Sequence, residues 1–176
     1  MFSALLNKRI FAVLCLFLLL FSSSSIAVTL TVVNTGDSGP GTLRDAITLA
    51  NGTPGNDYIN FNLGPGGPFT ITLVSALPNI TDNAGLYING FDNSGNNGTP
   101  NSVAVFSTSI AAPLNPSFVI VLANGNNLPV GLNITSSNNM IRGLVLHDFG
   151  DGTPSGNDIY ISIASTAASN TIVGCY

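Results

Sequence analysis

Two stretches near the C-terminal end of this chain match one another at a spacing of 31 residues. Residues 137–144 have the sequence SNNMIRGL, and residues 168–175 have the sequence ASNTIVGC. The segments 132–135 and 161–164 precede the two copies in similar places. A period of about 20 to 50 residues is typical of chains that stack one supersecondary unit on the next. The repeat therefore predicts stacked coils, in which matching residues of successive coils lie side by side.

The residues shared by the two copies predict two kinds of contact between neighbouring coils. Equivalent residues of parallel coils lie about 4.8 Å apart, so Ile141 and Ile172 are expected to form an apolar column. Asn139 and Asn170 are expected to stack likewise, with their amides hydrogen-bonded along the axis as an asparagine ladder. Such a ladder satisfies polar groups that point inward where the chain bends.

Short runs rich in β-branched and aromatic residues follow residue 27, separated by clusters of Gly, Asn and Pro. These runs predict strands joined by turns, and they leave a sandwich, a barrel and a solenoid as candidate architectures. The internal repeat favours the solenoid, a parallel β-helix. The expected strands are Val28–Val33, Asp57–Asn62, Phe69–Val74, Ala84–Asn89, Val103–Phe106, Phe118–Ala123, Val130–Thr135, Asn139–Leu146, Asp158–Ser162 and Thr171–Val173.

One helix is expected in the chain after residue 27, over Thr42–Ala50. Thr42 and Asp45 have the spacing of a capping box, and Asn51-Gly52 supplies a stop signal. Apolar residues at i, i+3, i+4 and i+7 form one stripe on this helix. A stack of coils exposes an apolar face at its first coil, so we expect the helix to cap that end. The stripe consists of Leu43, Ala46, Ile47 and Ala50.

Residues 1–27 have the three parts of a cleavable signal peptide. Met1–Arg9 ends in two positive charges, Ile10–Phe21 is an unbroken apolar run, and Ser25 and Ala27 are small residues at the expected cleavage site. A membrane anchor is the alternative, but the apolar run is shorter than the roughly 20 residues that span a bilayer. We expect an exported protein, secreted or at the cell surface, with no transmembrane span after cleavage.

The chain that remains after residue 27 is acidic and contains few charges. It holds two arginines, Arg44 and Arg142, against eight aspartates, which gives a net charge of −6 with His147 neutral. Nucleic-acid binding requires a basic stripe, which this chain lacks, so that function class is excluded. Its one cysteine, Cys175, leaves no internal disulfide. Abundant Val, Ile, Leu and Phe indicate a chain able to bury a core.

The segment Leu30–Ile47, LTVVNTGDSGPGTLRDAI, resembles the opening of bacterial exported proteins with right-handed parallel β-helix repeats, in the pectin-lyase-like superfamily. Asn56–Phe61, Ile71–Leu73 and Leu77–Thr81 extend this resemblance, and Asn139–Leu144 is similar to the repeating coil unit. The resemblance implies an all-β, right-handed parallel β-helix with a short N-terminal amphipathic capping helix. The fold serves surface adhesins, passenger domains and polysaccharide-active enzymes alike, so it does not select an activity.

The resemblance also implies a domain organisation. Related proteins run for more coils and end in a cap, a secretion module or an anchor. Residues 28–176 are therefore expected to form the N-terminal cap and the first coils of a β-helix truncated at its C-terminus, after the signal peptide 1–27.

Polysaccharide lyases of this fold use a cationic base beside carboxylates that hold calcium, and glycoside hydrolases need two carboxylates placed close together. The candidates here for catalysis are Arg142, His147, Asp148 and Asp151, which are close in sequence. Arg44 lies on the expected cap helix, away from any groove. The alternative is an ordinary solvated face, and we favour it over a catalytic site.

Metal binding has a few possible ligands. The segment Asp92–Gly98 has oxygen side chains at alternate positions but one carboxylate, and Asp148 and Asp151 flank Phe149-Gly150. Calcium prefers several carboxylates, so the turn chemistry of Gly and Asn explains these segments better. We expect no cofactor, with calcium at Asp92, Asp148 or Asp151 as the alternative.

The sequence as a whole favours an exported, non-enzymatic surface protein of the adhesin type. A surface of Asn, Ser and Thr with few charges suits weak, repeated contacts with a glycan or a host-cell ligand. The alternative is a carbohydrate-active enzyme, either a polysaccharide lyase or a glycoside hydrolase of the same fold.

Overall fold

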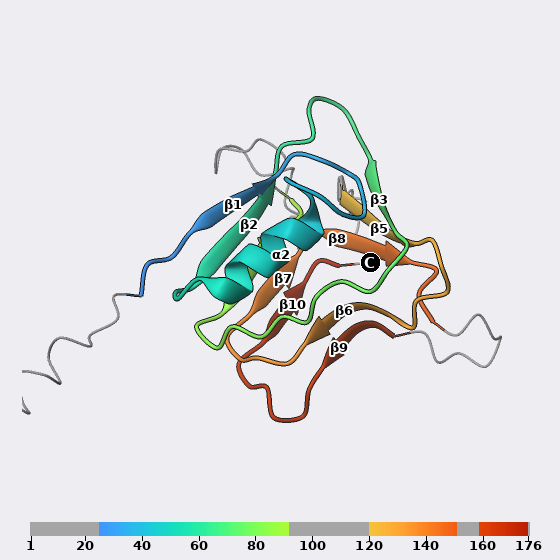
Figure 1. Cartoon of the computed structure of the whole chain (residues 1–176). Coiled ribbons are helices and arrows are strands. Elements are labelled where there is room, and N and C mark those ends of the chain that lie inside the picture. Colours follow the sequence, from blue (N-terminus) through green and yellow to red (C-terminus); the bar gives the residue numbers. More distant parts are fainter. Residues whose placement is uncertain (1–24, 92–119, 151–158, 176) are drawn as a thin grey trace, which may run out of the picture.

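The structure is a computed structural model, and it describes residues 25–91, 120–150 and 159–175. These residues form mostly β-structure with one short helix (Figure 1). The elements in chain order are β1 (Thr29–Val32), α2 (Leu43–Gly52), β2 (Asp57–Phe61), β3 (Phe69–Leu73), β4 (Leu86–Asn89), β5 (Ile120–Asn124), β6 (Val130–Ile134), β7 (Met140–Arg142), β8 (Leu144–His147), β9 (Ile159–Ile163) and β10 (Thr171–Val173).

The described strands form three sheets, and every strand pairing in them is parallel. Sheet 1 has the order β1-β2-β4-β7-β10, sheet 2 the order β3-β5-β8, and sheet 3 pairs β6 with β9. Ile80 adds a parallel bridge to Ile134 at the edge of sheet 3. Along the chain, β4, β5 and β6 enter sheets 1, 2 and 3 in turn, and β7, β8 and β9 repeat that order.

The strand register confirms the predicted match between the two repeat copies. Ile172 pairs with Ile141 in sheet 1, and Leu132 pairs with Ile161 in sheet 3. Ile141 also pairs with Ile88, and the same position continues through the two remaining strands of sheet 1. The resulting apolar column consists of Leu30, Ile59, Ile88, Ile141 and Ile172. Its three central residues, Ile59, Ile88 and Ile141, are fully buried.

The predicted contact between Asn139 and Asn170 is also confirmed. The Asn139 Nδ2 donates to Asn170 Oδ1 at 2.9 Å, and the backbone N–H of Asn139 donates to the same oxygen at 2.9 Å. Asn139 Oδ1 in turn accepts the backbone N–H of Leu86 at 2.8 Å. Each side-chain oxygen therefore satisfies a buried backbone donor on the preceding strand, which burial would otherwise penalise.

Asp57 takes the equivalent place on β2, two strands from Asn139, with Leu86 of β4 between them. It pairs in register with Leu86, and its Oδ1 accepts the backbone N–H of Val28 at 2.8 Å. The side chain of Leu86 carries no acceptor, so Asp57 donates its own backbone N–H to the carbonyl of Gly85 instead. Leu86 thus interrupts the polar column, and Asp57 resumes it with a carboxylate in place of an amide.

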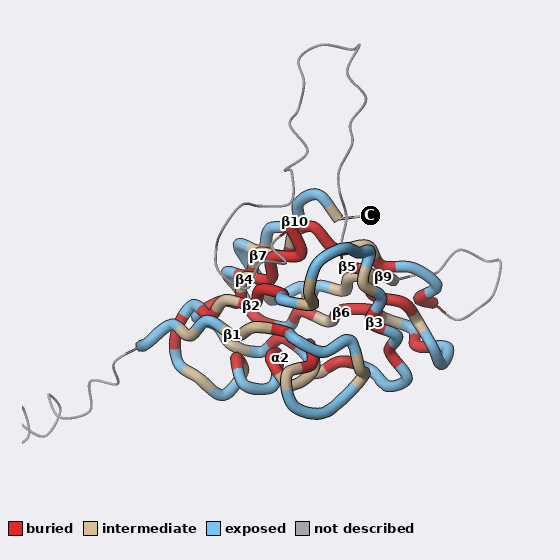
Figure 2. Tube along the Cα trace, turned by 90° about the horizontal axis from the view of Figure 1, so that it is seen from above, coloured by how far each residue is buried: buried red, intermediate tan, exposed pale blue. Residues whose placement is uncertain are grey.

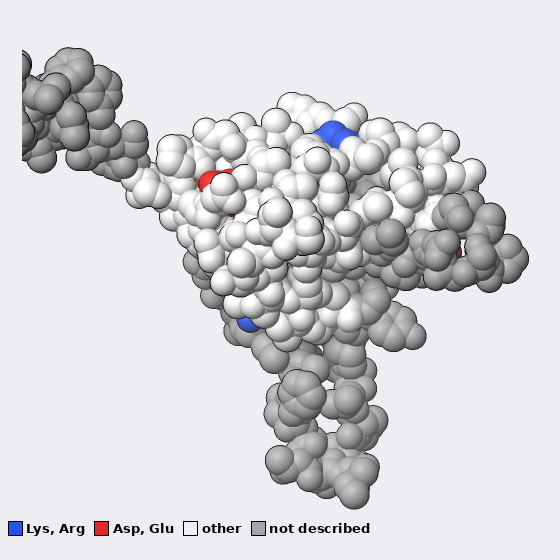
Figure 3. All heavy atoms as spheres, turned by 90° about the horizontal axis from the view of Figure 1, so that it is seen from below, with Lys and Arg blue, Asp and Glu red and all other residues white. Residues whose placement is uncertain are grey.

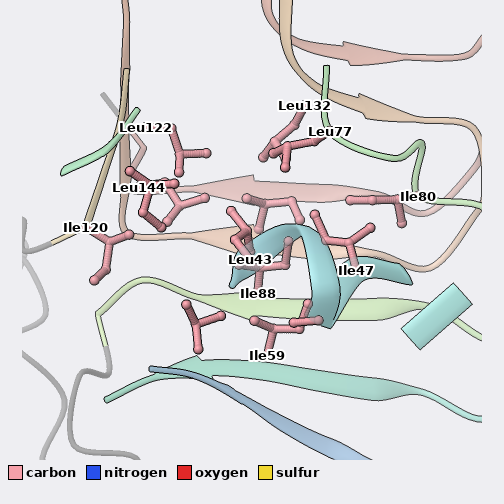
Figure 4. Packing of buried hydrophobic residues seen from close by; sticks show 14 of the residues in the cluster. Leu43, Ile47, Ile59, Leu77, Ile80, Ile88, Ile120, Leu122, Leu132 and Leu144 are labelled. Atoms are coloured by element: carbon pink, nitrogen blue, oxygen red, sulfur yellow. The ribbon is translucent and has the colours of Figure 1, made fainter. Parts of the chain in front are cut away.

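Helix α2 lies where the sequence predicts a helix. Thr42 accepts the backbone N–H of Asp45 at 3.3 Å, and Asp45 Oδ2 accepts the backbone N–H of Gly41 at 2.9 Å, which completes the cap. The helix packs on β1 and β2, and it lies at the end of sheet 1 opposite β10 (Figure 2). Leu43 and Ile47 point into a core shared with residues of all three sheets (Figure 4).

The prediction of one strand over Asn139–Leu146 is wrong. The segment forms two strands, β7 in sheet 1 and β8 in sheet 2, with a corner at Gly143 between them. Gly143 has a φ of +70°, a left-handed conformation that glycine adopts without a steric penalty. A Cβ at this position would lie 2.6 Å from the backbone nitrogen of Phe91. The other described strands lie within about two residues of their predicted ends, and Val103–Phe106 lies outside the described residues.

Among the described residues, no helix is long and apolar enough to cross a membrane. The predicted signal peptide lies almost wholly outside the described residues, which begin at Ser25.

Candidate ligand-binding surface

Two tyrosines stack on the outer face of sheet 1. The sequence Tyr-Ile-Asn occurs at residues 58–60 of β2 and again at residues 87–89 of β4. The strands pair with Tyr58 opposite Tyr87, and their ring centroids lie 4.1 Å apart with 19° between the planes. Because the neighbouring Ile59 and Ile88 are buried, both tyrosines point to the opposite face, where they are half-exposed.

Arg142 continues this surface on the next strand, β7. It pairs in register with Asn89, and its Nε donates to Asn89 Oδ1 at 2.9 Å. Its guanidinium carbon lies 5.2 Å from the ring centroid of Tyr87 and 5.9 Å from that of Phe91. Both distances are within the range of cation–π attraction. The guanidinium is therefore held by one hydrogen bond and two rings, while its two terminal nitrogens make no hydrogen bond to the described residues.

The surroundings of Tyr87 raise the pKa of its hydroxyl. Burial and a hydrogen bond with Tyr58 raise the pKa of Tyr87 to about 12, against a smaller opposing effect of the Arg142 charge. Tyr87 therefore stays a neutral hydrogen-bonding group throughout the physiological pH range.

A buried amide lies beside these residues. Asn60 is 1 % exposed, and its Oδ1 has no hydrogen-bond partner among the described residues. Its equivalent on the next strand, Asn89, is 5 % exposed and bonds to Arg142. An unsatisfied buried amide oxygen is uncommon in folded proteins, and it leaves an acceptor at the base of this surface.

We define the Tyr–Arg surface as the half-buried side chains of Tyr58, Tyr87 and Arg142, together with the buried Asn89 and Phe91 that contact Arg142. It combines aromatic carbon, phenol hydroxyls and a guanidinium held in one place. Such a set can bind a ligand that presents C–H groups and hydrogen-bonding oxygens together, because each kind of group meets a matching partner. The rest of the molecule bears few charges, and the face seen in Figure 3 consists almost entirely of neutral residues.

His147 and Asp148 lie at a different place from Arg142. His147 ends β8 in sheet 2, four residues beyond the corner at Gly143, or roughly 13 Å along the strand. Its Nδ1 contacts Asp148 Oδ2 at 2.7 Å, and the two side chains are 47 % and 75 % exposed. The structure thus joins His147 to Asp148 and places both in another sheet than Arg142. Asp151 lies outside the described residues.

The structure describes only one of the three predicted calcium ligands, Asp148. Asp92 and Asp151 lie outside the described residues, and Asp148 is exposed beside His147. Within the described ranges, no three His, Cys, Asp or Glu side chains lie close enough together to hold a metal ion.

Arg44 lies in α2, the expected cap helix, and its side chain makes structural contacts there. Its Nη2 donates to Asp37 Oδ1 at 2.7 Å and to the carbonyl of Ser75 at 2.7 Å. Burial opposes ionisation of Asp37, but hydrogen bonds from Arg44, Ser75 and Val74 outweigh it and hold the pKa of Asp37 below its ordinary value. This ion pair ties the loop before α2 to the end of β3.

Four residues of the Tyr–Arg surface were not predicted as site residues: Tyr58, Tyr87, Asn89 and Phe91. The repeated Tyr-Ile-Asn at residues 58–60 and 87–89 was the available signal, because identical residues at a repeat spacing stack on the same face.

The chain has no counterpart in the comparisons with known proteins: no family model and no curated protein matches its sequence, and no solved structure matches its fold.

Proposed function

We propose that this chain is an exported, non-enzymatic protein of the cell surface, built as a right-handed parallel β-helix, that binds a glycan through the Tyr–Arg surface. The observation that carries the proposal is the guanidinium of Arg142, which lies near the rings of Tyr87 and Phe91 and is hydrogen-bonded to the amide of Asn89. Export follows from the signal-peptide pattern of residues 1–27.

The strand order supports the β-helix. The chain enters sheets 1, 2 and 3 in turn, returns to sheet 1 at β7, and repeats the order before it reaches β10. All pairings of the described strands are parallel, and α2 packs on the first two strands of sheet 1, where a capping helix is expected. Parallel strands joined by crossovers are right-handed in nearly all known sheets, which supports the proposed hand.

The residue types of the Tyr–Arg surface support a sugar ligand. A sugar ring presents C–H groups, which pack on aromatic carbon, and hydroxyls, which accept from a guanidinium and donate to an amide oxygen. Tyr and Arg supply most of the binding energy in many interfaces, because they combine large contact areas with directed hydrogen bonds. A carboxylate on the sugar would add a charge-assisted bidentate contact to Arg142.

The separation of the candidate catalytic residues supports binding rather than turnover. A cationic base and its partner must both reach the reacting atoms, within about 3 Å of them. Arg142 lies in sheet 1, whereas His147 and Asp148 lie at the far end of β8 in sheet 2.

Glycan binding by the exported protein tests this proposal directly. On an array of neutral and acidic glycans, Tyr87→Ala and Arg142→Ala should each weaken binding at least about tenfold, a loss of about 1.4 kcal/mol. His147→Ala removes an exposed ring from another sheet and should bind like the unchanged chain. Equal binding by all variants, or no bound glycan, would contradict the proposal. Turnover of an acidic polysaccharide that is lost in Arg142→Ala would favour the lyase instead.

A further inference from the structure

We infer that removal of residues 1–27 creates a partly buried ion pair between the new α-ammonium group of Val28 and the carboxylate of Asp57, and that this pair fixes the start of β1. The inference rests on the proposed export, because it needs cleavage after Ala27. It assigns to Asp57 the task of receiving the N-terminus that processing releases.

Val28 is already held by hydrogen bonds at its backbone nitrogen and at its carbonyl oxygen. Its nitrogen donates to Asp57 Oδ1 at 2.8 Å, and its carbonyl accepts the backbone N–H of Tyr58 at 2.8 Å. The residues before it are exposed, with Ile26 at 67 %, and β1 begins directly after it at Thr29. The expected cleavage site thus lies where the exposed leader joins the first residue bonded to sheet 1.

Asp57 is a buried carboxylate without a cationic partner among the described residues of the unprocessed chain. It is 0 % exposed, and its second oxygen accepts the hydroxyl of Thr53. Among the described basic side chains, Arg44 pairs with Asp37 and His147 contacts Asp148, while Arg142 bonds to an amide. Buried charges in proteins are normally paired, because removing an ion from water is costly. A positive charge beside position 57 would pair this carboxylate, and no described side chain supplies one.

Cleavage supplies that charge at the required atom. Hydrolysis of the Ala27–Val28 peptide bond consumes one water, leaves a carboxylate on Ala27, and leaves an amine on Val28. The amine takes up a proton at neutral pH, because an α-amino group has a pKa of about 8. The neutral amide donor 2.8 Å from Asp57 Oδ1 thus becomes an ammonium donor on the same nitrogen. Charge-assisted hydrogen bonds are roughly twice as strong as neutral ones.

The composition makes this ion pair easy to measure. The only lysine of the chain, Lys8, lies in the leader, so the α-amine is the only primary amine of the processed protein. An amine-acetylating reagent therefore reports on Val28 alone. Only the unprotonated amine reacts, and an ion pair with Asp57 keeps it protonated and covered.

The experiment exports the full chain from a bacterial host, identifies the N-terminal residue by mass spectrometry, and measures the acetylation rate at pH 7. The test variant inserts one glycine after Ala27. This chain keeps Asp57 and the Val28 amide bond as they are in the structure, but its ammonium group lies one residue further out. Asp57→Asn provides a second test, and Asp148→Asn, which removes an exposed carboxylate, is the matched control.

We expect the unchanged protein and Asp148→Asn to be acetylated at least about tenfold more slowly than the glycine-insertion protein, and more slowly than Asp57→Asn if that variant folds. A tenfold difference corresponds to one unit in the pKa of the amine. Equal rates in a protein that begins at Val28 would overturn the ion pair and leave the proposed export intact. A protein that keeps its leader, or is cleaved elsewhere, would contradict both the inference and the proposed processing.

Discussion

Tyr87 connects the two ends of the Tyr–Arg surface, since its ring lies against Tyr58 on one strand and near the guanidinium of Arg142 on another. Its neighbours act on its hydroxyl as well as on its position. Burial and the hydrogen bond with Tyr58 favour the neutral phenol over the phenolate. The same contacts that present Tyr87 to a ligand thus make the protein sensitive to high pH.

The raised pKa of Tyr87 predicts a loss of stability at alkaline pH. In the unfolded chain a tyrosine ionises near pH 10, whereas Tyr87 in the folded chain ionises at about 12. The folded state therefore binds more protons between these values, so the free energy of unfolding should fall as the pH rises from about 10 to about 12. Urea unfolding across this range measures the effect, and Tyr87→Phe should flatten it. An equally steep fall in Tyr87→Phe would contradict this account.

Single residues could be predicted from the sequence where a repeat links them. Asn139 and Asn170 lie in adjacent copies, so their contact was predictable from their spacing. Asn89 and Arg142 also pair on adjacent strands, but 53 positions separate them. No repeat relates these two residues, and their contact depends on a strand register that local sequence does not determine. The stacked Tyr58 and Tyr87 were therefore predictable from the repeated Tyr-Ile-Asn, whereas their place beside Arg142 was not.

At the scale of elements, local chemistry explains which predictions succeeded. The signals for α2 all lie within the helix and its ends, and Thr42 caps it as expected. The segment 139–146 has an uninterrupted pattern of β-forming residues, so the corner within it was not predicted. Gly143 turns the chain there from sheet 1 to sheet 2, and its left-handed φ together with the close approach of Phe91, just after β4, requires glycine.

Gly143→Ala tests the corner. Both the left-handed φ of +70° and the approach of a Cβ to Phe91 disfavour a side chain at this position. We expect a loss of about 3 kcal/mol in the free energy of unfolding. Gly39→Ala is the control for backbone strain, because Gly39 has a φ of +102° but a Cβ added there would meet no atom within 4 Å, so strain alone should cost about 1–2 kcal/mol. Equal losses in the two variants would show that contact with Phe91 is unimportant.

At the scale of the whole molecule, sheet 1 is the largest of the three sheets that the described strands form. It runs from β1, which packs against α2, to β10, whose residues are all exposed. Its outer face carries the Tyr–Arg surface, and the Val28 nitrogen bonded to Asp57 lies directly before its first strand. Both proposals therefore depend on the stacking of its five strands in one parallel register.

A distance between the first and last strands of sheet 1 tests that stacking most directly. Thr29 and Thr171 are exposed and occupy equivalent register positions, joined through Tyr58, Tyr87 and Met140. Spin labels at Thr29→Cys and Thr171→Cys, with Cys175→Ser, allow their separation to be measured by pulsed electron paramagnetic resonance. Four parallel strand spacings predict a narrow distribution centred at roughly 19 Å. A distribution centred at about 30 Å or beyond would exclude five strands stacked at these spacings and contradict the account.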